Sequence, residues 1–406
     1  MHLLLLTPQF PYPPHQGATL RNFHLLRGLA ARHTVDLFSL LAPDDDATAG
    51  PVREWVRLLI TAPQPQRRQR QRLRDLLTSP WPDMVLRLWH PAAMARLQDY
   101  LRHHRPDLIQ VQGLEMAHYA FHLLRRRKRP PMVYDAYNVE AVLQWRSFLA
   151  DLRRPQRWPA AAYSAIQTLK LRRYEQRFIR QVQALTAVSA VDAALLRTLA
   201  PNTPLAIVSN GVDMAAYDPE RAYPSPYPFP GPHLVFTGKM DFRPNVDAAL
   251  WFAEAVLPRL RAGGLRPHFW VVGRSPHPRL QRLRQHPDIT LTGAVPDVRP
   301  YLAHADLFVA PLLAGGGTRL KLLEAMAMAR PIVSTRIGAE GFPVRDGEEM
   351  ALADTAADFA ARCRHLLLHP DEARALGHRG RQLAAHYDWS RIVPRLESLY
   401  QELGLI

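Results

Sequence analysis

The amino-acid sequence predicts an α/β fold with two doubly wound domains that face a common cleft. Short apolar runs alternate with longer amphipathic stretches, which is the pattern of parallel sheets covered by helices. A proline-rich stretch divides this alternation into two series. The length of 406 residues also exceeds a single ordinary core and suggests two domains of about 200 residues each.

The first series indicates a Rossmann-like domain over residues 1–212. Its candidate strands have the nearly continuous hydrophobicity of parallel strands that are buried on both faces. Apolar residues at helical spacing predict helices over Arg21–Arg32 and Tyr163–Gln181. The candidate strands are His2–Thr7, Val35–Leu40, Leu108–Gln112, Met132–Asp135, Leu185–Val188 and Leu205–Ser209.

Residues 213–232 are expected to form a linker, because they include the run Ala222-Tyr-Pro-Ser-Pro-Tyr-Pro-Phe-Pro-Gly-Pro232. Proline removes backbone donors and restricts its neighbours, so this run favours neither a helix nor a central strand. A second Rossmann-like domain is expected over 233–385, and a C-terminal amphipathic helix over 386–406 that can cross back to the first domain. The candidate strands of the second domain are Leu234–Thr237, Phe269–Val272, Ile289–Thr292, Leu307–Ala310 and Ile332–Thr335.

The net charge of +16 is concentrated in the first domain, where residues 1–212 carry +14. Basic clusters stand at Arg67–Arg74 and Arg125–Arg129. Such a field attracts anionic lipid head groups, nucleic acid or acidic saccharide carriers, although arginine-rich segments are also common on solvated surfaces. The asymmetry between the two halves favours an anionic partner for the first domain.

Other features of the composition point to a cytoplasmic protein without a cofactor. The single cysteine, Cys363, excludes an internal disulfide and disfavours a cysteine-based metal cluster. The first residues are too short and too uncharged for a signal peptide, and no run reaches the roughly 18 apolar residues of a membrane span. The acidic run Asp44–Asp46 is interpreted as a helix cap or a solvated loop, and no His-x-Glu-x-x-His or Cys-x-x-Cys pattern occurs. We therefore expect neither a metal nor another cofactor.

The segment Gly315-Gly-Gly-Thr-Arg-Leu-Lys-Leu-Leu-Glu324 is the strongest indication of chemistry. It joins a predicted strand to a predicted helix through three glycines, and the first N–H groups of a helix have no partner inside it. This geometry binds phosphate. Lys321 and Glu324 lie on one helical face, where they suit a diphosphate and ribose hydroxyls respectively. A tight strand-to-helix turn without a ligand is the alternative interpretation.

Several motifs in their order and spacing resemble those of retaining glycosyltransferases of the GT-B fold, family 4, of the bacterial cell-surface polysaccharide kind. The resemblance covers nearly the whole chain. The motifs are Pro8-Gln-Phe-Pro-Tyr-Pro-Pro-His-Gln-Gly17 with Arg21, Asp135-Ala-Tyr-Asn-Val-Glu140, Val208-Ser-Asn-Gly-Val-Asp213, Phe236-Thr-Gly-Lys-Met-Asp-Phe-Arg-Pro-Asn-Val-Asp247, Val271-Val-Gly273, Thr292-Gly-Ala-Val-Pro-Asp297 and Gly315–Ala327.

The resemblance implies a nucleotide-sugar donor bound by the second domain. Glu324 resembles the second glutamate of the family's Glu-x7-Glu motif, which holds the ribose, whereas Gly316 stands where the first glutamate is expected. Lys239 resembles the basic residue after the glycine that opens the second domain, and Arg243 lies beside the family's next basic position. The expected donor-binding residues are Gly17, Gly238, Gly273, Val295, Gly316, Gly317, Thr318, Arg319, Lys321 and Glu324.

Metal-free transfer must stabilise the negative charge that builds on the departing diphosphate with fixed donors and cations. Lys239, Arg243, Lys321 and Glu324 are accordingly the expected catalytic residues, and Lys321 is preferred over Arg319 as the phosphate cation. No residue indicates a protein nucleophile, which agrees with the front-face mechanism that the resemblance implies. Candidates on the acceptor side, each also compatible with a structural role, are Glu115, His118, Tyr137, Asn138 and Glu140.

The expected partners are a nucleotide-diphosphate sugar, a saccharide or lipid-linked acceptor, and the anionic inner face of the cell membrane. A nucleotide-sugar epimerase of the same fold and a scaffold derived from an inactive transferase remain alternatives. A dehydrogenase is disfavoured because no Gly-x-Gly-x-x-Gly follows a predicted strand. A nucleic-acid-binding protein would explain the charge, but its basic clusters lack interleaved aromatics, so no nucleic acid is expected.

Overall fold

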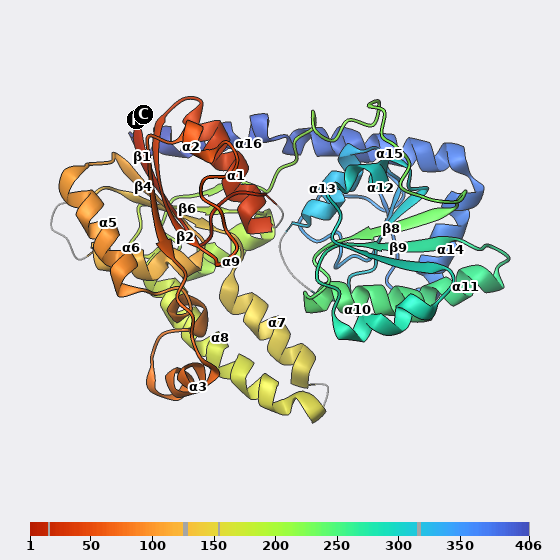
Figure 1. Cartoon of the computed structure of the whole chain (residues 1–406), viewed down its shortest axis with the longest axis horizontal. Helices are drawn as coiled ribbons and strands as arrows, with labels where there is room; N and C mark the ends of the chain where they lie inside the picture. The colour runs from red at the N-terminus through yellow and green to blue at the C-terminus, as the bar shows by residue number, and fades with distance from the viewer. Residues whose placement is uncertain (15–16, 125–128, 153–154, 315–317, 406) are drawn as a thin grey trace. The chain divides into compact units, whose positions relative to one another are not determined.

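The chain folds into two compact units (Figure 1). Unit 1 comprises Met1–Ser209 and Trp389–Ile406, and unit 2 comprises Asn210–Asp388. Each unit has a parallel sheet at its centre with helices on both faces. The computed structural model describes residues 1–14, 17–124, 129–152, 155–314 and 318–405.

The sheet of unit 1 has seven parallel strands, in the order β3-β2-β1-β4-β5-β6-β7, within the described residues. All six predicted strands form, with ends within two residues of the expected ones. The seventh, β3, was not predicted because it is a partly buried edge strand without a continuous apolar run. The strands are β1 (His2–Thr7), β2 (Thr34–Leu41), β3 (Leu58–Pro63), β4 (Leu108–Gln112), β5 (Met132–Ala136), β6 (Ala184–Ala187) and β7 (Leu205–Ile207).

Helices cover both faces of this sheet, and two of them, α7 and α8, pack along each other as a long antiparallel pair. Both predicted helices of the first domain form, as α1 and α8. The helices are α1 (Gly17–Ala30), α2 (Val52–Trp55), α3 (Gln69–Thr78), α4 (Asp83–Leu86), α5 (Pro91–His103), η1 (Leu114–Met116), α6 (Ala117–Leu124), α7 (Glu140–Leu152), η2 (Pro155–Arg157), α8 (Trp158–Ile179), α9 (Ala190–Leu199) and α16 (Trp389–Glu402).

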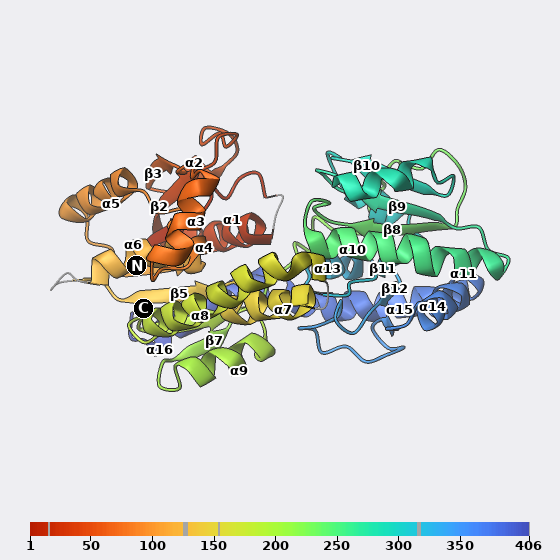
Figure 2. The same cartoon turned by 90° about the horizontal axis from the view of Figure 1, so that it is seen from below.

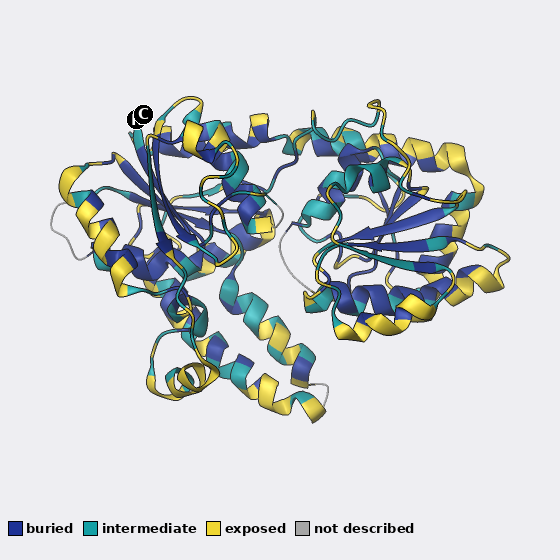
Figure 3. Ribbon diagram, viewed as in Figure 1, coloured by how far each residue is buried: buried dark blue, intermediate teal, exposed yellow. Residues whose placement is uncertain are grey.

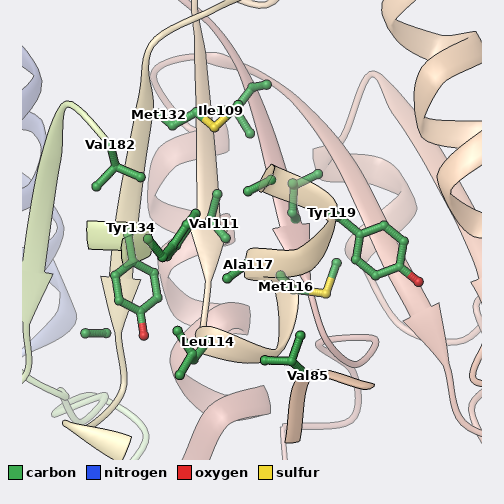
Figure 4. Packing of buried hydrophobic residues seen from close by; sticks show 14 of the residues in the cluster. Val85, Ile109, Val111, Leu114, Met116, Ala117, Tyr119, Met132, Tyr134 and Val182 are labelled. Atoms are coloured by element: carbon green, nitrogen blue, oxygen red, sulfur yellow. The ribbon is translucent and has the colours of Figure 1, made fainter. Parts of the chain in front are cut away.

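The strands of unit 1 are buried on both faces, as their unbroken hydrophobicity predicts. Ile109 and Val111 of β4 point to one face, together with Tyr134 of β5 (Figure 4). Leu108 and Val133, at the intervening positions, belong to the core on the other face. Because successive side chains of a strand alternate between faces, each short strand serves two cores.

The C-terminal helix α16 belongs to unit 1, where it lies beside α1 and β7 (Figure 2). Its buried apolar residues include Val393, and a Cβ atom at Gly28 of α1 would lie 2.6 Å from the Cγ2 atom of Val393. The buried hydroxyl of Tyr400 donates a hydrogen bond to the Oε1 atom of Gln110 in β4. The amphipathic tail therefore completes the core of the first domain. This agrees with the expectation that the C-terminal helix can cross back to that domain.

Unit 2 repeats the architecture with six parallel strands, in the order β10-β9-β8-β11-β12-β13, within the described residues. The five predicted strands form, and the two-residue strand β13 was not predicted. The elements are β8 (His233–Thr237), α10 (Arg243–Trp251), the π-helix η3 (Phe252–Val256), α11 (Leu257–Ala262), β9 (His268–Val272), η4 (Pro278–Gln285), β10 (Ile289–Gly293), α12 (Arg299–Ala303), β11 (Leu307–Ala310), α13 (Leu320–Ala327), β12 (Ile332–Ser334), β13 (Ala351–Leu352), α14 (Ala356–Leu368), α15 (Pro370–Ala384) and η5 (Ala385–Tyr387).

The proline-rich stretch expected as a linker over 213–232 lies within unit 2. The chain passes from unit 1 to unit 2 before it, between Ser209 and Asn210, and returns after Asp388. Within the stretch, the ring of Tyr227 contacts Trp270 at a centroid distance of 4.8 Å, and its hydroxyl donates to the Tyr301 carbonyl oxygen at 2.7 Å. Prolines exclude helix and central strand, as expected, but the aromatic residues between them anchor the stretch to the sheet of unit 2.

Both sheets reverse their strand order at one point, between β1 and β4 in unit 1 and between β8 and β11 in unit 2. Ligands of open parallel sheets bind outside the carboxyl ends of the strands at such switch points. Apart from the partly buried His2 of β1, the strands at these points are buried throughout in both units (Figure 3). The two switch points are therefore the places where a site is expected within each unit.

Candidate functional site

At the switch point of unit 2, two loops touch through glycines. Gly238 follows β8 with a φ of 153°, and Gly273 follows β9 with a φ of 156°. A Cβ atom at Gly273 would lie 1.7 Å from the carbonyl oxygen of Gly238. Only glycine permits this approach, and both positions were predicted from the sequence. The floor of the site is therefore bare backbone.

Helix α13 brings Lys321 to this floor. The Nζ atom of Lys321 donates a hydrogen bond to the Oδ1 atom of Asn245 at 2.8 Å and lies 4.1 Å from the centroid of the Phe236 ring. Burial lowers the pKa of Lys321 to about 7, the positive charge of Arg319 contributes, and Glu324 opposes the change. An ammonium group in this position gains most from an anionic ligand, because it is removed from water.

Glu324 lies one helical turn after Lys321 and accepts a hydrogen bond from the hydroxyl of Tyr217. Burial raises the pKa of Glu324, while this hydrogen bond and the charge of Lys321 oppose the rise. The pKa of Tyr217 is raised well above its usual value by burial and by Glu324. The tyrosine therefore stays protonated and donates to the carboxylate, which leaves the other lone pairs of Glu324 to accept from hydroxyl groups.

Asn245, which the sequence analysis did not single out, connects the two loops of the site. It is 6% exposed, it accepts from Lys321, and its Nδ2 atom donates to the Lys239 carbonyl oxygen at 2.9 Å. A polar residue directly after Pro244, in the first turn of α10, was the available signal. Tyr217 was missed as well, and no local pattern marks it.

The other predicted basic residues of unit 2 lie at the rim. Lys239 pairs with Asp241 at 3.3 Å, and both side chains are 43% exposed. Arg243 lies 3.5 Å from Asp247, which also binds Arg279 at 2.7 Å. Lys321 and Glu324 are buried together, whereas Lys239 and Arg243 remain partly exposed and pair with aspartates.

The remaining predicted donor residues occupy varied positions. Arg319 is the N-cap residue of α13, and Thr318 is 7% exposed and accepts a hydrogen bond from Asn210 at 3.2 Å. Val295 packs, partly buried, against the core beneath the site. Gly17 opens α1 in unit 1. Gly316 and Gly317 lie outside the described residues.

In unit 1, Arg21 of α1 and Asp135 of β5 form a buried ion pair. Both side chains are 1% exposed, and the Nη2–Oδ1 distance is 2.6 Å. Arg21 also donates to the Ser209 carbonyl oxygen at 3.1 Å, and Thr186 donates to Asp135. A pair so enclosed ties α1 to β5, β6 and the end of β7, which indicates a structural role.

Four of the five predicted acceptor-side residues gather at the carboxyl ends of β4 and β5. A Cβ atom at Gly113, whose φ is 75°, would lie 2.8 Å from both the Oε2 atom of Glu115 and the Cε2 atom of Tyr137. Burial and the nearby charge of Glu115 raise the pKa of Glu140 well above its usual value. Asn138 contacts Glu140 at 3.5 Å. These residues could accept hydrogen bonds from a polar ligand.

Glu175 completes this acidic group, and sequence reasoning missed it. It is fully buried in α8 and accepts from the backbone N–H groups of Glu140 and Ala141 at the start of α7, at 3.4 and 3.5 Å. Burial raises the pKa of Glu175 to about 7. Its position among apolar residues of one helical face was a signal that a carboxyl group is buried there.

His118, the remaining acceptor-side candidate, lies apart in an aromatic cluster. Its ring is 4.6 Å from that of Trp89 and 5.2 Å from that of Trp81, and Tyr174 contacts its Nδ1 atom at 3.5 Å. A cavity of about 110 Å³ adjoins this cluster and includes Phe121 in its lining. This position agrees with a packing role for His118, which was one of the two interpretations of its sequence.

Two further features of the described residues concern membranes and metals. None of the described helices is long and apolar enough to span a membrane. One exposed group, His365, His369 and Glu372, has possible ligand atoms within 4.8 Å of one another. It lies where α14 meets α15, and none of its members is among the predicted site residues.

The two halves of the chain match two families of glycosyltransferases. Residues 16–216 match the family described as Glycosyltransferase Family 4, and residues 231–369 match Glycosyl transferases group 1. The chain is a glycosyltransferase of the GT-B fold. The matches favour transfer over the epimerase alternative.

Curated relatives of this glycosyltransferase carry the names of different enzymes. It is 28% identical over 233 residues to phosphatidyl-myo-inositol mannosyltransferase of Propionibacterium freudenreichii, an alignment that covers 56% of this chain and 58% of that protein. It is 25% identical to glycogen synthase of Mycobacterium tuberculosis, with 98% and 94% covered. The chain thus spans only a little over half the length of the mannosyltransferase that it matches.

Solved structures share the fold of the glycosyltransferase over its whole length. Sucrose-phosphate synthase from Thermosynechococcus elongatus superposes with a TM-score of 0.72 at 17% identity, covering 100% of this chain and 99% of that one. Anabaena HepE in complex with UDP and glucose superposes with a TM-score of 0.65 at 15% identity, covering 99% and 100%. WaaG, a glycosyltransferase involved in lipopolysaccharide biosynthesis, gives 0.64 at 16%, covering 98% and 99%. At these identities the similarity shows the fold alone.

Proposed function

We propose that this glycosyltransferase transfers a hexose from a nucleotide-diphosphate sugar to a hydroxyl group of a saccharide or lipid-linked acceptor, with retention and without a metal. The observation that carries the proposal is Lys321, a buried cation held by Asn245 at the glycine-lined switch point of unit 2. A diphosphate would supply an anionic partner for this ammonium group, which is held by the neutral amide of Asn245. Glu324, fixed by Tyr217, would accept hydrogen bonds from the ribose hydroxyls.

In the proposed reaction, the bond between the anomeric carbon and the diphosphate breaks, and the acceptor oxygen forms the new bond on the same face of the sugar. The departing phosphate oxygen takes the proton of the acceptor hydroxyl. Lys321 stabilises the charge that develops on the diphosphate, as a fixed cation does in a site without water. Lys239 and Arg243 add positive charge at the rim of the site. This route needs no protein nucleophile.

The proposed ligands agree with what is named for similar proteins. HepE is described in complex with UDP and glucose, and the mannosyltransferase is named for a phosphatidylinositol acceptor. A lipid-linked acceptor fits an enzyme on the inner face of the cell membrane, in cell-surface polysaccharide or glycolipid synthesis. The surplus of positive charge in the first half of the chain fits an anionic membrane surface.

The donor is tested by thermal unfolding with UDP, GDP, ADP and NAD, in the presence of EDTA. A ligand at 100 times its Kd should stabilise the protein by about 2.7 kcal/mol. We expect one nucleoside diphosphate to stabilise the wild type and not Glu324→Ala, whereas the exposed control Glu254→Ala should respond as the wild type does. Stabilisation by duplex DNA in place of any nucleotide would overturn the proposal.

Retention and metal independence can be tested only by measuring the transfer reaction. With the identified donor sugar and a soluble acceptor glycoside, NMR of the product gives the configuration of the new bond, and EDTA should leave the rate unchanged. Inversion, or loss of turnover in EDTA that Mg²⁺ restores, would contradict the corresponding part of the proposal.

A further inference from the structure

Three neighbouring helices of unit 1 expose large apolar side chains. Leu73 and Leu77 of α3 are 64% and 77% exposed, and Trp158 and Leu169 of α8 are 60% and 61% exposed. Helix α7 adds Trp145, Leu149 and Leu152, each at least 42% exposed. We call these seven residues the apolar surface. Concentrations of exposed apolar side chains on a soluble protein mark contact with a partner or a membrane.

Helix α3 is attached to α8 although none of its own residues is buried (Figure 3). The Nζ atom of Lys170 in α8 donates to the carbonyl oxygens of Leu76 at 2.6 Å and Ser79 at 2.7 Å, at the carboxyl end of α3. This contact fixes the helix end without a core beneath it. Leu73 and Leu77 of this helix face solvent.

The apolar residues of α3 share their helical face with arginines. Arg70, Leu73, Arg74 and Leu77 follow the spacing i, i+3, i+4 and i+7, which places them in one stripe. Among the described residues Arg70 makes no ion pair, and Arg74 pairs only with its neighbour Asp75 while 70% exposed. The stripe combines apolar side chains with cations that can reach an external anion.

The same combination recurs on the α7–α8 pair. Trp145, Leu149 and Leu152 follow the spacing i, i+4 and i+7 on α7. On α8, Leu169 lies eleven residues after Trp158, on the same face, and the exposed Arg172 and Arg173 flank it. No acidic residue occurs between residues 155 and 174. Leucines and tryptophans with a rim of arginines are the composition that binds at the interface of an anionic bilayer.

From these observations we infer that the apolar surface and its arginines dock this enzyme on an anionic lipid bilayer. The inference rests on the proposed lipid-linked acceptor and adds where the membrane contacts the protein. Helix α7 begins at Glu140, beside Glu115 and Tyr137 at the carboxyl edge of the sheet, and its 13 residues extend about 20 Å from there. A membrane bound along α7 presents lipid head groups to these acceptor-side candidates.

The test is binding to vesicles of phosphatidylcholine with and without phosphatidylglycerol. The wild type should bind the anionic vesicles, and 0.5 M salt should weaken this binding, because arginine–phosphate attraction is screened. Leu73→Ser/Leu77→Ser, Trp145→Ser/Trp158→Ser and Arg70→Gln/Arg172→Gln/Arg173→Gln should each weaken it more than tenfold. The exposed controls Val191→Ser, Arg197→Gln and Leu368→Ser should bind as the wild type does.

Unchanged vesicle binding in all three surface variants would overturn the inference. So would a wild-type dimer that these variants convert to monomers with no change in vesicle binding, because the surface would then join two copies of the chain. The nucleotide-dependent thermal shift should be the same in every surface variant. If vesicle binding depends on this surface but no nucleotide shifts the unfolding temperature, the proposed donor chemistry is wrong and the docking surface is supported.

Discussion

The Nζ atom of Lys321 in α13 donates a hydrogen bond to the Oδ1 atom of Asn245 in α10, across 76 positions of sequence. The Nδ2 atom of the same asparagine donates to the carbonyl oxygen of Lys239. One amide therefore sets the position of the buried ammonium group and of the loop that follows β8. The proposed donor site therefore has connected parts that can be tested separately.

Asn245→Ala should weaken nucleoside diphosphate binding about tenfold, because a hydrogen bond to a charged group contributes about 1.5–3 kcal/mol and part of it is recovered by water. The fold should persist, since the side chain is small. Titration calorimetry measures the affinity, and Asn202→Ala, at an exposed position, is the matched control. An unchanged Kd would show that Asn245 does not position the cation.

Nucleotide binding should be accompanied by proton uptake at Lys321. Burial holds its pKa at about 7 without ligand, so at pH 8 most molecules carry a neutral amine. A bound diphosphate raises this pKa, and the linkage predicts uptake approaching about one proton at pH 8 and weaker binding as the pH rises above 7.

Calorimetry in buffers of different ionisation enthalpy measures this uptake. Lys321→Met should abolish it, whereas Lys239→Met, at an exposed lysine of the same site, should retain it even where the affinity falls. Equal uptake in wild type and Lys321→Met would assign the proton to another group.

Gly273→Ala should lower the free energy of unfolding by about 3 kcal/mol or more, because overpacking and positive φ act together there. Its Cβ atom would lie 1.7 Å from the Gly238 carbonyl oxygen. Gly264 also has a positive φ, of 84°, but no atom lies within 4 Å of a Cβ atom placed there. Gly264→Ala should therefore cost only about 1 kcal/mol. Urea unfolding compares the two, and equal midpoints would contradict the close approach of the loops.

Glu175 should make unit 1 less stable as the pH rises. Its pKa is raised from 4.5 to about 7 in the folded protein, so the folded state binds more protons between these values. The stabilisation is complete below pH 4.5 and is lost as the pH passes 7, with a difference on the order of 3 kcal/mol. Glu175→Gln should remove this part of the pH dependence. Urea unfolding at pH 5 and pH 8 measures it, and Glu254→Gln should retain the wild-type slope.

The sequence by itself determined the two α/β series, eleven of the strands and the C-terminal helix, and it indicated Gly238, Gly273, Lys321 and Glu324 as candidate residues of one site. These features depend on local periodicity and on residue types at turns, which short segments carry. The tertiary structure alone decided which partners hold the site. Asn245, Tyr217 and Glu175 act on residues far away in the sequence, and burial, which no local pattern measures, sets the pKa values of Lys321, Glu324 and Glu175. It also decided that the proline-rich stretch packs on unit 2 and that β3 joins the sheet, because the long-range contacts of aromatic rings and of an edge strand outweigh weak local preferences.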